Sequence, residues 1–288
     1  MSDACILQHQ ETWPIAVWCE VLDVSRRGFD ASAQRQAAPG GDHEEVVLLA
    51  RVRAMHTKTR PSDGSRRMAK PLQAEGVLVG RDNARRLRPA AGVVVRHRQR
   101  GPVTPDSRQG AAVAPNLWAR PCDGAPSDTV WAGDLTSLWT AAGWVSVAAG
   151  LDWPSRHVVG WAMSRRIDAA LVREALGLAL GRRGPAPGFM QHSDRGRQDA
   201  CGAYQELLAA QSIRCSMRRT GDGLDHAVVE RSFGSFKRER TALGHSATRQ
   251  EARDDVSDDR EMFYNSTRWH SSLGSVSPND FERVANVA

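Results

Sequence analysis

The amino-acid sequence predicts a mixed α/β fold, in which a five-stranded sheet with flanking helices is preceded by a small all-α, helix-turn-helix-like region. Three observations predict it. Short amphipathic stretches fill residues 1–90, a segment rich in Pro, Gly and Arg covers residues 91–127, and strand and helix patterns alternate over residues 128–288. With 288 residues, the chain can bury the core of one α/β domain and carry a smaller attachment. We therefore expect a helical region, a linker and a larger C-terminal domain at these boundaries.

The first helical unit has the minimum content of a helix-turn-helix. Residues 14–21 and 25–29 have helical patterns, and residues 22–24 between them are typical of a turn. Taken alone, this pattern is a weak signal for DNA binding.

A second unit of three helices is expected at residues 44–55, 66–72 and 82–87. Its last helix carries Arg85, Arg86 and Arg88. A basic helix at the end of such a unit is suited to the DNA major groove, and ordinary surface arginines are the alternative interpretation. Arg66 and Arg67, at the start of the second helix, are further candidates for DNA contact.

Basic residues are concentrated in one part of the chain. Residues 51–110 contain 15 Lys and Arg against 4 Asp and Glu, whereas residues 1–50 contain 3 against 8 and residues 111–288 contain 21 of each. A positive field of this kind usually attracts phosphate, so we expect contact with nucleic acid. A solvated basic linker is the alternative. Within the linker, residues 113–118 are expected to pack on the following domain.

After the linker, the sequence predicts three strands, a helix, a strand, a helix and a strand. The strands are expected at residues 129–139, 143–151, 156–164, 188–192 and 213–216, and the helices at residues 167–183 and 199–211. A further helix is expected over residues 222–243, and C-terminal helices are expected to complete this domain. The turn signal at residues 152–155 makes the first three strands a meander, and the alternation that follows indicates a mixed sheet.

The composition argues against several classes of protein. No apolar run approaches the ~20 residues of a membrane-spanning helix, and residues 1–10 lack the pattern of a signal peptide, so a cytoplasmic location is expected. The five cysteines form no Cys-x-x-Cys pair and have no zinc-finger spacing. They therefore indicate neither a structural zinc site nor a disulfide framework.

Three carboxylates carry the functional hypothesis: 59 residues separate Asp134 from Asp194, and 35 separate Asp194 from Glu230. Asp134 lies within a predicted strand, where a buried carboxylate is costly without a cation. Asp194 follows the fourth strand, at a carboxyl end where sites form, and Glu230 lies on the helix predicted over residues 222–243. Lys237 is seven residues beyond Glu230 and shares its helix face, where a cation can hold a phosphate.

Each acid also has a simpler interpretation. Asp134 is then a strand-end cap, Asp194 a turn former and Glu230 an exposed helix residue. Asp152 and Asp225 are competing carboxylates, but the first is typical of a hairpin turn and the second of a helix start. Mg²⁺ prefers carboxylate oxygens and keeps waters for substrate phosphates. Three acids from three elements are therefore suited to two Mg²⁺ ions, or Mn²⁺ in their place, against one scissile phosphate.

Each acid lies within a longer motif. These motifs are Trp131-x-x-Asp134-Leu135-Thr136, His192-Ser193-Asp194-Arg195-Gly196-x-Gln198 and Ala227-Val228-Val229-Glu230-x-x-Phe233. Outside them stand Gly64-Ser65-Arg66-Arg67, Leu151-Asp152-x-x-Ser155-Arg156 and Tyr264-Asn265-x-x-Arg268-x-His270. Together they resemble the retroviral-integrase-like core and flanking regions of bacterial insertion-sequence transposases, in particular the orfB product of the insertion-sequence-three family.

The resemblance implies a ribonuclease-H-like fold and a DDE transposase in which Asp134, Asp194 and Glu230 bind Mg²⁺ and Lys237 accompanies them. It implies that water frees a 3′ hydroxyl at the element's end, and that this hydroxyl attacks another phosphodiester without a covalent enzyme intermediate. The implied partners are double-stranded DNA (terminal inverted repeats and target), a companion orfA protein, and further copies of the chain in a homo-oligomer on DNA.

Arg195, Arg218 and Arg219 flank the second acid and the loop before the helix predicted over residues 222–243. They are interpreted either as a clamp on DNA or as part of a solvated turn. Departures from the family pattern occur at Asp63, Ser137, Asp199 and His226. Two alternatives therefore stay open: a decayed, non-catalytic DNA-binding relative, and a ribonuclease-H-like nuclease that does not join strands.

Overall fold

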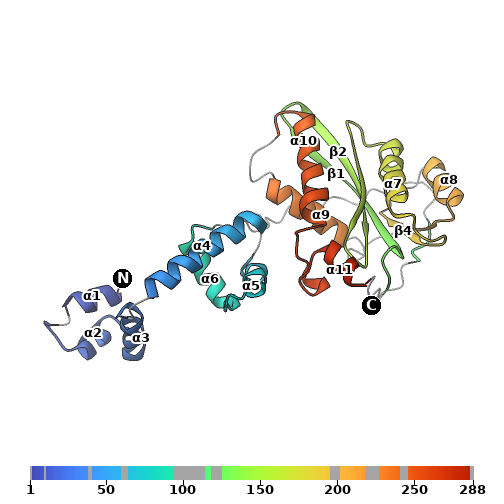
Figure 1. Ribbon diagram of the computed structural model, residues 1–288. Helices are drawn as coiled ribbons and strands as arrows, with labels where there is room; N and C mark the ends of the chain where they lie inside the picture. Colours follow the sequence, from blue (N-terminus) through green and yellow to red (C-terminus); the bar gives the residue numbers. More distant parts are fainter. Residues whose placement is uncertain are drawn as a thin grey trace.

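The structure is a computed structural model, and it describes residues 2–9, 11–37, 41–59, 64–93, 114–117, 125–194, 202–217, 227–240 and 246–285. Six N-terminal helices extend from one side of a domain built on a sheet (Figure 1). The predicted succession of helical elements followed by a mixed sheet is confirmed.

The first helices form a small unit with its own core. It comprises α1 (Ser2–His9), α2 (Ile15–Val21) and α3 (Arg26–Ala37). Ile6, Cys19 and Phe29 are buried together, one from each helix. The two helices that the sequence predicts are present, and α3 extends further than expected. Helix α1 was not predicted, because a single buried side chain fixes it and eight residues give little periodicity to recognise.

The second unit confirms the three predicted helices. They are α4 (Gly41–Thr59), α5 (Ser65–Ala74) and α6 (Arg81–Ala90). Val52 and Met55 from α4, Met68 and Leu72 from α5, and Leu87 from α6 form one buried cluster. Apolar side chains recur three or four residues apart on each helix, so each buries one stripe and leaves its charged side exposed.

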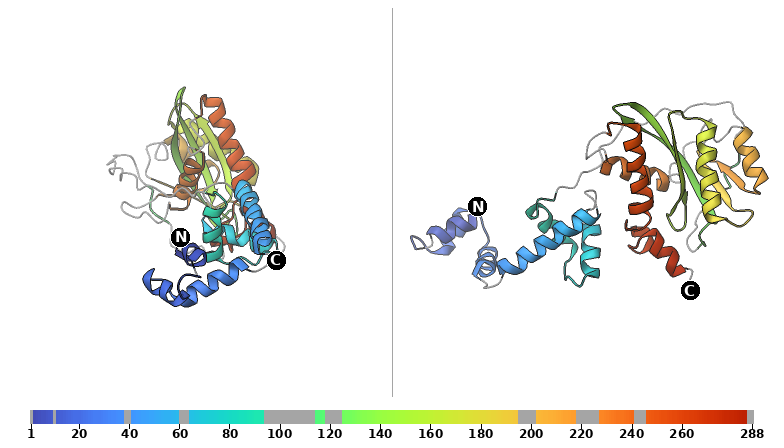
Figure 2. Two further views of the ribbon diagram at one scale, coloured as in Figure 1. Left: turned by 90° about the vertical axis from the view of Figure 1, so that its left-hand side faces the viewer. Right: turned by 45° about the horizontal axis from the view of Figure 1, so that its top comes forward.

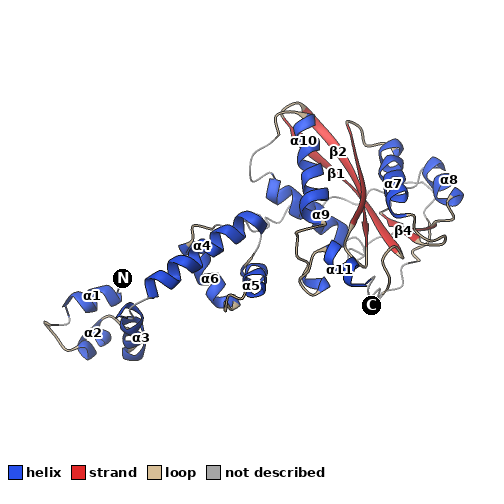
Figure 3. Ribbon diagram, in the orientation of Figure 1, coloured by secondary structure: helices blue, strands red, loops and turns tan. Residues whose placement is uncertain are grey.

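The sheet has five strands in the order β3-β2-β1-β4-β5. Its strands are β1 (Val130–Thr140), β2 (Gly143–Asp152), β3 (Val158–Ser164), β4 (Met190–Ser193) and β5 (Arg214–Met217). The β1-β2 and β2-β3 pairs are antiparallel, whereas β1-β4 and β4-β5 are parallel. This order and these directions confirm the predicted mixed sheet and are typical of the ribonuclease-H-like fold. Figure 3 shows the strands between two groups of helices.

One face of the sheet is covered by α7 (Ala169–Arg183) and α8 (Gly202–Ala210) (Figures 1 and 2). Asp168 caps α7, because its Oδ1 accepts a hydrogen bond of 3.0 Å from the Leu171 N–H. Helix α7 lies unusually close to β3 at Gly160. A Cβ added there would be 2.6 Å from the carbonyl oxygen of Ala175 and 2.7 Å from the nitrogen of Ala179. Only glycine allows this approach without displacing the helix.

The other face is covered by α9 (Ala227–Arg240) and α10 (Arg249–Ser257). A cluster on this face joins Ala132 of β1 to Val229, Phe233 and Phe236 of α9 and to Val256 of α10. Helix α9 begins at Ala227 among the described residues, and the rest of the predicted range of 222–243 lies outside them.

The C-terminal segment adds a π-helix (Asp258–Tyr264), a 3₁₀-helix (Ser271–Leu273) and α11 (Pro278–Ala285). Asn265 ties it to the sheet: its Oδ1 accepts a 2.8 Å hydrogen bond from the Val158 N–H, and its Nδ2 donates one of 3.0 Å to the Val158 carbonyl. Arg183 at the end of α7 forms ion pairs with Asp128 at 2.9 Å and Glu282 of α11 at 2.8 Å.

Part of the predicted linker contacts the sheet. Residues 114–117 lie against β5, since the Leu117 N–H donates to Ser216 Oγ at 3.0 Å and the Met217 N–H donates to the Pro115 carbonyl at 3.4 Å. The prediction that this part of the linker packs on the sheet domain is confirmed for these residues. Among the described helices, none is both long enough and apolar enough to cross a membrane.

Candidate active site

Asp134 and Asp194 occupy matching positions in the register of β1 and β4. Asp134 is inside β1, opposite Ala149 of β2, and Asp194 directly follows β4. The parallel pairing matches Val130 with Met190 and Ala132 with His192. The same offset carried two residues further sets Asp134 beside Asp194, about 5 Å apart at the spacing of adjacent strands. Two like charges at that spacing favour a cation between them.

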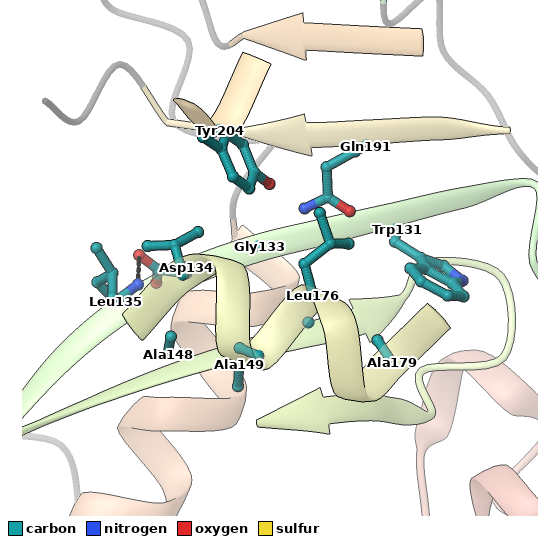
Figure 4. Close-up of a pocket in the computed structure, with 13 residues that line it drawn as sticks. Trp131, Gly133, Asp134, Leu135, Ala148, Ala149, Leu176, Ala179, Gln191 and Tyr204 are labelled. Carbon is teal, nitrogen blue, oxygen red and sulfur yellow. Dashed lines mark hydrogen bonds between the residues drawn. The ribbon is translucent and has the colours of Figure 1, made fainter. Parts of the chain in front are cut away.

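Strand alternation assigns these two acids to one face. Ala132 belongs to the cluster on the α9 face, and side chains two residues apart share a face. Asp134 therefore faces the side of the sheet that α9 covers. Its Oδ1 also accepts a 2.7 Å hydrogen bond from the Leu135 N–H, which restrains the carboxylate (Figure 4).

A small cavity of about 20 Å³ lies next to Asp134, between the sheet and α7 (Figure 4). It is lined mainly by apolar side chains, with Gln191 as a polar member. A space of this size holds about one water molecule. It has no room for a nucleotide.

Helix α9 brings Lys237 towards Asp134. Burial lowers the pKa of the Lys237 ammonium below its ordinary value, and the charge of Asp134 acts in the opposite direction. Glu230 lies on the first turn of the same helix and is exposed. Because Glu230 and Lys237 are seven residues apart, they share one side of α9.

The three acids do not meet at one point in this structure. Among the described residues, no group of three or more His, Cys, Asp or Glu side chains is close enough to hold a metal ion. The arrangement pairs Asp134 with Asp194 across two strands and Asp134 with Lys237 across the sheet–helix interface, while Glu230 lies further out on α9. Asp152, the competing carboxylate, is fully buried and accepts hydrogen bonds from Asp128 N and from Ser155. It therefore holds the turn, as its sequence context indicates.

The candidate DNA-binding arginines have different surroundings. On α6, Arg85 is exposed, Arg86 forms a 2.6 Å ion pair with Glu45 of α4, and Arg88 is half-buried. Of these, Arg85 is the best placed to contact a partner. Arg66 and Arg67 lie on α5. Only the Arg67 side chain is described, and it lines a cavity together with residues of the sheet domain. Arg195, Arg218 and Arg219 lie outside the described residues, as does Asp225.

Sequence reasoning missed a basic cavity on another side of α9. Its volume is about 260 Å³, and its lining includes Arg156, Arg231, Arg238, Arg268 and His270. Part of a signal was present, since Arg156, Arg268 and His270 belong to two of the quoted motifs. Their convergence depends on chain segments more than 100 residues apart, which no local pattern reveals.

Comparisons with known proteins follow the same division of the chain. A family model described as "Integrase core domain" matches residues 126–222, and a second model with that description matches residues 211–278. The chain is 33% identical to the transposase InsF for insertion sequence IS3A of Escherichia coli (strain K12) over 288 residues, covering 98% of both proteins. It is 32% identical to the insertion element IS600 uncharacterized 31 kDa protein of Shigella sonnei, covering 91% of this chain and 96% of that protein. The chain belongs to the IS3-type insertion-sequence transposases.

Solved structures are more distant from this transposase. A catalytic core domain of HTLV-2 integrase in complex with magnesium has 15% identity and a TM-score of 0.42, covering 55% of this chain and 99% of that chain. A simian T-cell lymphotropic virus intasome has 13% identity and a TM-score of 0.44, covering 74% and 70%. Family and integrase core together make the transposase an enzyme of the polynucleotidyl-transferase type, which acts in DNA transposition and integration.

Proposed function

We propose that this transposase cleaves the ends of an insertion sequence and joins the freed 3′ hydroxyl to DNA, with Asp134, Asp194 and Glu230 as its metal ligands. The observation that carries the proposal is the register of β1 and β4, which sets Asp134 beside Asp194. Placing two carboxylates side by side within a sheet is unfavourable unless a cation compensates them. A fold that keeps this arrangement is explained by cation binding.

The donor set suits Mg²⁺. All three side chains offer carboxylate oxygens, the ligands that Mg²⁺ prefers, and none offers the nitrogen or sulfur that zinc selects. Two bound Mg²⁺ ions would supply activation of the attacking hydroxyl and stabilisation of the leaving 3′ oxygen. Asp134 and Asp194 would form the fixed half of the site. Glu230 would complete it from α9 when DNA binds, and Mn²⁺ is expected to replace Mg²⁺.

Lys237 would contribute a positive charge beside the same site. Its ammonium interacts with Asp134 across the interface between β1 and α9. A non-bridging oxygen of the scissile phosphate would lie between the lysine and the metal ligands and would accept a hydrogen bond from the ammonium. This contact would hold the phosphate in line for attack. Lys237 would therefore orient the phosphate rather than transfer a proton.

The reaction consists of a hydrolysis followed by a transesterification. Water attacks the phosphorus at the element's end, the bond from phosphorus to the 3′ oxygen breaks, and a free 3′ hydroxyl remains. That hydroxyl then attacks a second phosphodiester, forms a new P–O bond and releases another 3′ hydroxyl. The hydrolysis is favourable in itself and the second step exchanges one phosphodiester bond for another, so no ATP is required. Double-stranded DNA is the substrate, and a homo-oligomer, with an orfA companion, would hold the two ends together.

The test uses purified protein and labelled duplex carrying the element's terminal inverted repeat. With Mg²⁺ or Mn²⁺, we expect nicked ends and joined products from the wild type and neither from Asp194→Asn. Asp254→Asn is the matched control, because Asp254 is exposed on α10 and its carboxylate accepts a hydrogen bond only at the helix surface, from Gln250. Nicks without joining would identify a nuclease instead. Binding without cleavage would identify a non-catalytic relative.

A further inference from the structure

The basic cavity beside α9 is built by four separate parts of the chain. Arg67 comes from α5, Arg156 from the turn before β3, Arg231 and Arg238 from α9, and Arg268 from the segment after the π-helix. Of the described residues that line it, none is Asp or Glu. Five guanidinium groups surround about 260 Å³, and one of them, that of Arg268, is paired with Glu239 behind the lining. The lining therefore has a positive potential, since a concave surface of one sign focuses the field.

Hydroxyl groups complete the lining. Four serines, Ser232 and Ser235 of α9 with Ser271 and Ser272 after it, line the same space. Ser235 donates its hydroxyl to backbone carbonyls of α9, whereas Ser271 and Ser272 are exposed. Arginine presents several N–H donors in a fixed fork and an exposed serine adds an O–H donor, so both types suit the oxygens of a phosphate. A cavity of this volume is more than ten times larger than one water molecule needs and has room for a phosphodiester group.

An ion pair with a buried glutamate fixes the position of Arg268. Its Nη1 donates to Glu239 Oε1 at 2.7 Å, and the Glu239 side chain is fully buried. Arg156 has a φ of 62° and its guanidinium lies 4.1 Å from the ring centroid of Trp153. A left-handed backbone costs a non-glycine residue about 1 kcal/mol. An arginine kept at that cost, stacked on a tryptophan, is consistent with a side chain selected for its charge.

The pKa of His270 depends on the arginines of the cavity. Burial is the main cause that lowers its pKa from 6.5 to about 3, and the charges of Arg268, Arg67 and Arg156 lower it further. Its Nε2 is buried and has no hydrogen-bond partner among the described residues. An anion in the cavity would both compensate the arginines and offer this nitrogen a partner.

The position of the cavity relative to the acids narrows the choice of ligand. Arg231 and Arg238 are each one residue beyond Glu230 and Lys237, which turns them about 100° around α9 from the side that carries those two. The separation across the helix surface is of the order of its 10–12 Å diameter. A DNA strand that enters the site of the acids therefore passes within reach of the cavity.

We propose that this cavity binds a backbone phosphodiester of the DNA near the scissile phosphate. One side of α9 then contacts the DNA strand through Arg231 and Arg238, and another side of the helix carries Glu230. The inference rests on the proposed function for the identity of the anion as DNA. It assigns a positioning role to Arg231 and Arg238, which lie outside the metal site.

The test measures the affinity of the full chain for terminal inverted-repeat duplex in EDTA at several KCl concentrations. Each phosphate contact contributes about 0.9 to the slope of log K against log salt concentration. The double variant Arg231→Gln/Arg238→Gln is expected to bind about tenfold more weakly, with a slope smaller by about 0.9 or more. The double variant Arg173→Gln/Arg214→Gln is the matched control, because both arginines are exposed on α7 and β5 and neither lines the cavity.

A second pair of variants adds charge to the cavity instead of removing it. Ser272→Asp puts a carboxylate at an exposed position of the lining, and Ser266→Asp puts one at an exposed position outside it. Only the first is expected to weaken DNA binding. NMR titration of the wild type is expected to show the pKa of His270 rising when the duplex is added.

The outcomes separate this inference from the proposed function. An unchanged salt slope in the Arg231/Arg238 variant would overturn it, even if the wild type cleaves and joins DNA. Inorganic phosphate that stabilises the wild type, combined with that unchanged slope, would make the cavity a site for free phosphate and would also overturn it. A reduced slope supports it even if the wild type shows no cleavage with Mg²⁺, in which case only the proposed chemistry fails.

Discussion

Gly160 is predicted to set the distance between α7 and the sheet. A Cβ at this position would be 2.6 Å from the carbonyl oxygen of Ala175, whereas ordinary contacts begin at 3.4 Å. In Gly160→Ala, α7 must therefore move by about 0.8 Å. This displacement loosens the cluster in which Leu171 and Ala175 of α7 pack on Ala148 and Ala162.

The expected cost of Gly160→Ala is about 1–3 kcal/mol in the free energy of unfolding, the usual range for an overpacked core. For a domain of this size that lowers the melting temperature by about 2–12 °C. Differential scanning calorimetry measures it. Gly177→Ala is the matched control on the same helix: a Cβ there meets nothing within 4 Å, so the change is expected to stabilise the protein by about 0.5–1 kcal/mol. If Gly160→Ala melts at or above the wild-type temperature, α7 does not lie as close to β3 as the 2.6 Å contact requires.

Three other predictions concern charged groups. Lys237→Met is expected to slow end cleavage by about 10²-fold and Lys237→Arg to restore part of the rate; cleavage by the methionine variant at the wild-type rate would remove Lys237 from the site. His270 has a native pKa of about 3 against 6.5 when unfolded, so the unfolded chain binds more protons between these values. The free energy of unfolding is therefore expected to fall by at most about 4 kcal/mol as the pH drops from 6.5 to 3. In His270→Gln it is expected to fall less over this range and to follow the wild-type curve in parallel above pH 6.5. Identical pH profiles of the two proteins in urea denaturation would contradict this. Arg268→Met leaves the buried carboxylate of Glu239 without its 2.7 Å ion pair and is expected to cost about 3–5 kcal/mol. Adding Glu239→Gln should recover most of that loss in the same denaturation experiment, and a purely additive double variant would argue against the pair.

Local sequence patterns were sufficient to predict the strands and helices of the sheet domain from β1 to α9, whereas the C-terminal helices α10 and α11 were expected without bounds. β2 begins at Gly143 as expected, and α7 ends at Arg183 as expected, because turn residues and a helix cap bound them. Helix α1 was missed, and so was the π-helix over Asp258–Tyr264. A π-helix inserts an extra residue into a helical turn, and it depends on what packs against it rather than on periodicity.

The candidate site could be predicted only in part. The sequence identified Asp134 in a strand, Asp194 after a strand and Glu230 on a helix, since each has a distinct local context. That Asp134 stands beside Asp194 follows from the parallel pairing of β1 with β4. Paired residues of these strands are 60 positions apart in the sequence, so no local pattern reveals the pairing. The exposure of Glu230 and the approach of Lys237 to Asp134 likewise depend on how α9 packs on the sheet.

The central claim is that Asp134, Asp194 and Glu230 share one metal site. Fe²⁺ can occupy a carboxylate site made for Mg²⁺, and the hydroxyl radicals it generates with peroxide cut the protein backbone nearby. With DNA bound, we expect cuts close to all three acids, suppressed by excess Mg²⁺ and lost in Asp134→Asn. Cuts near Asp134 and Asp194 but none near Glu230, or cuts that Mg²⁺ does not suppress, would contradict it.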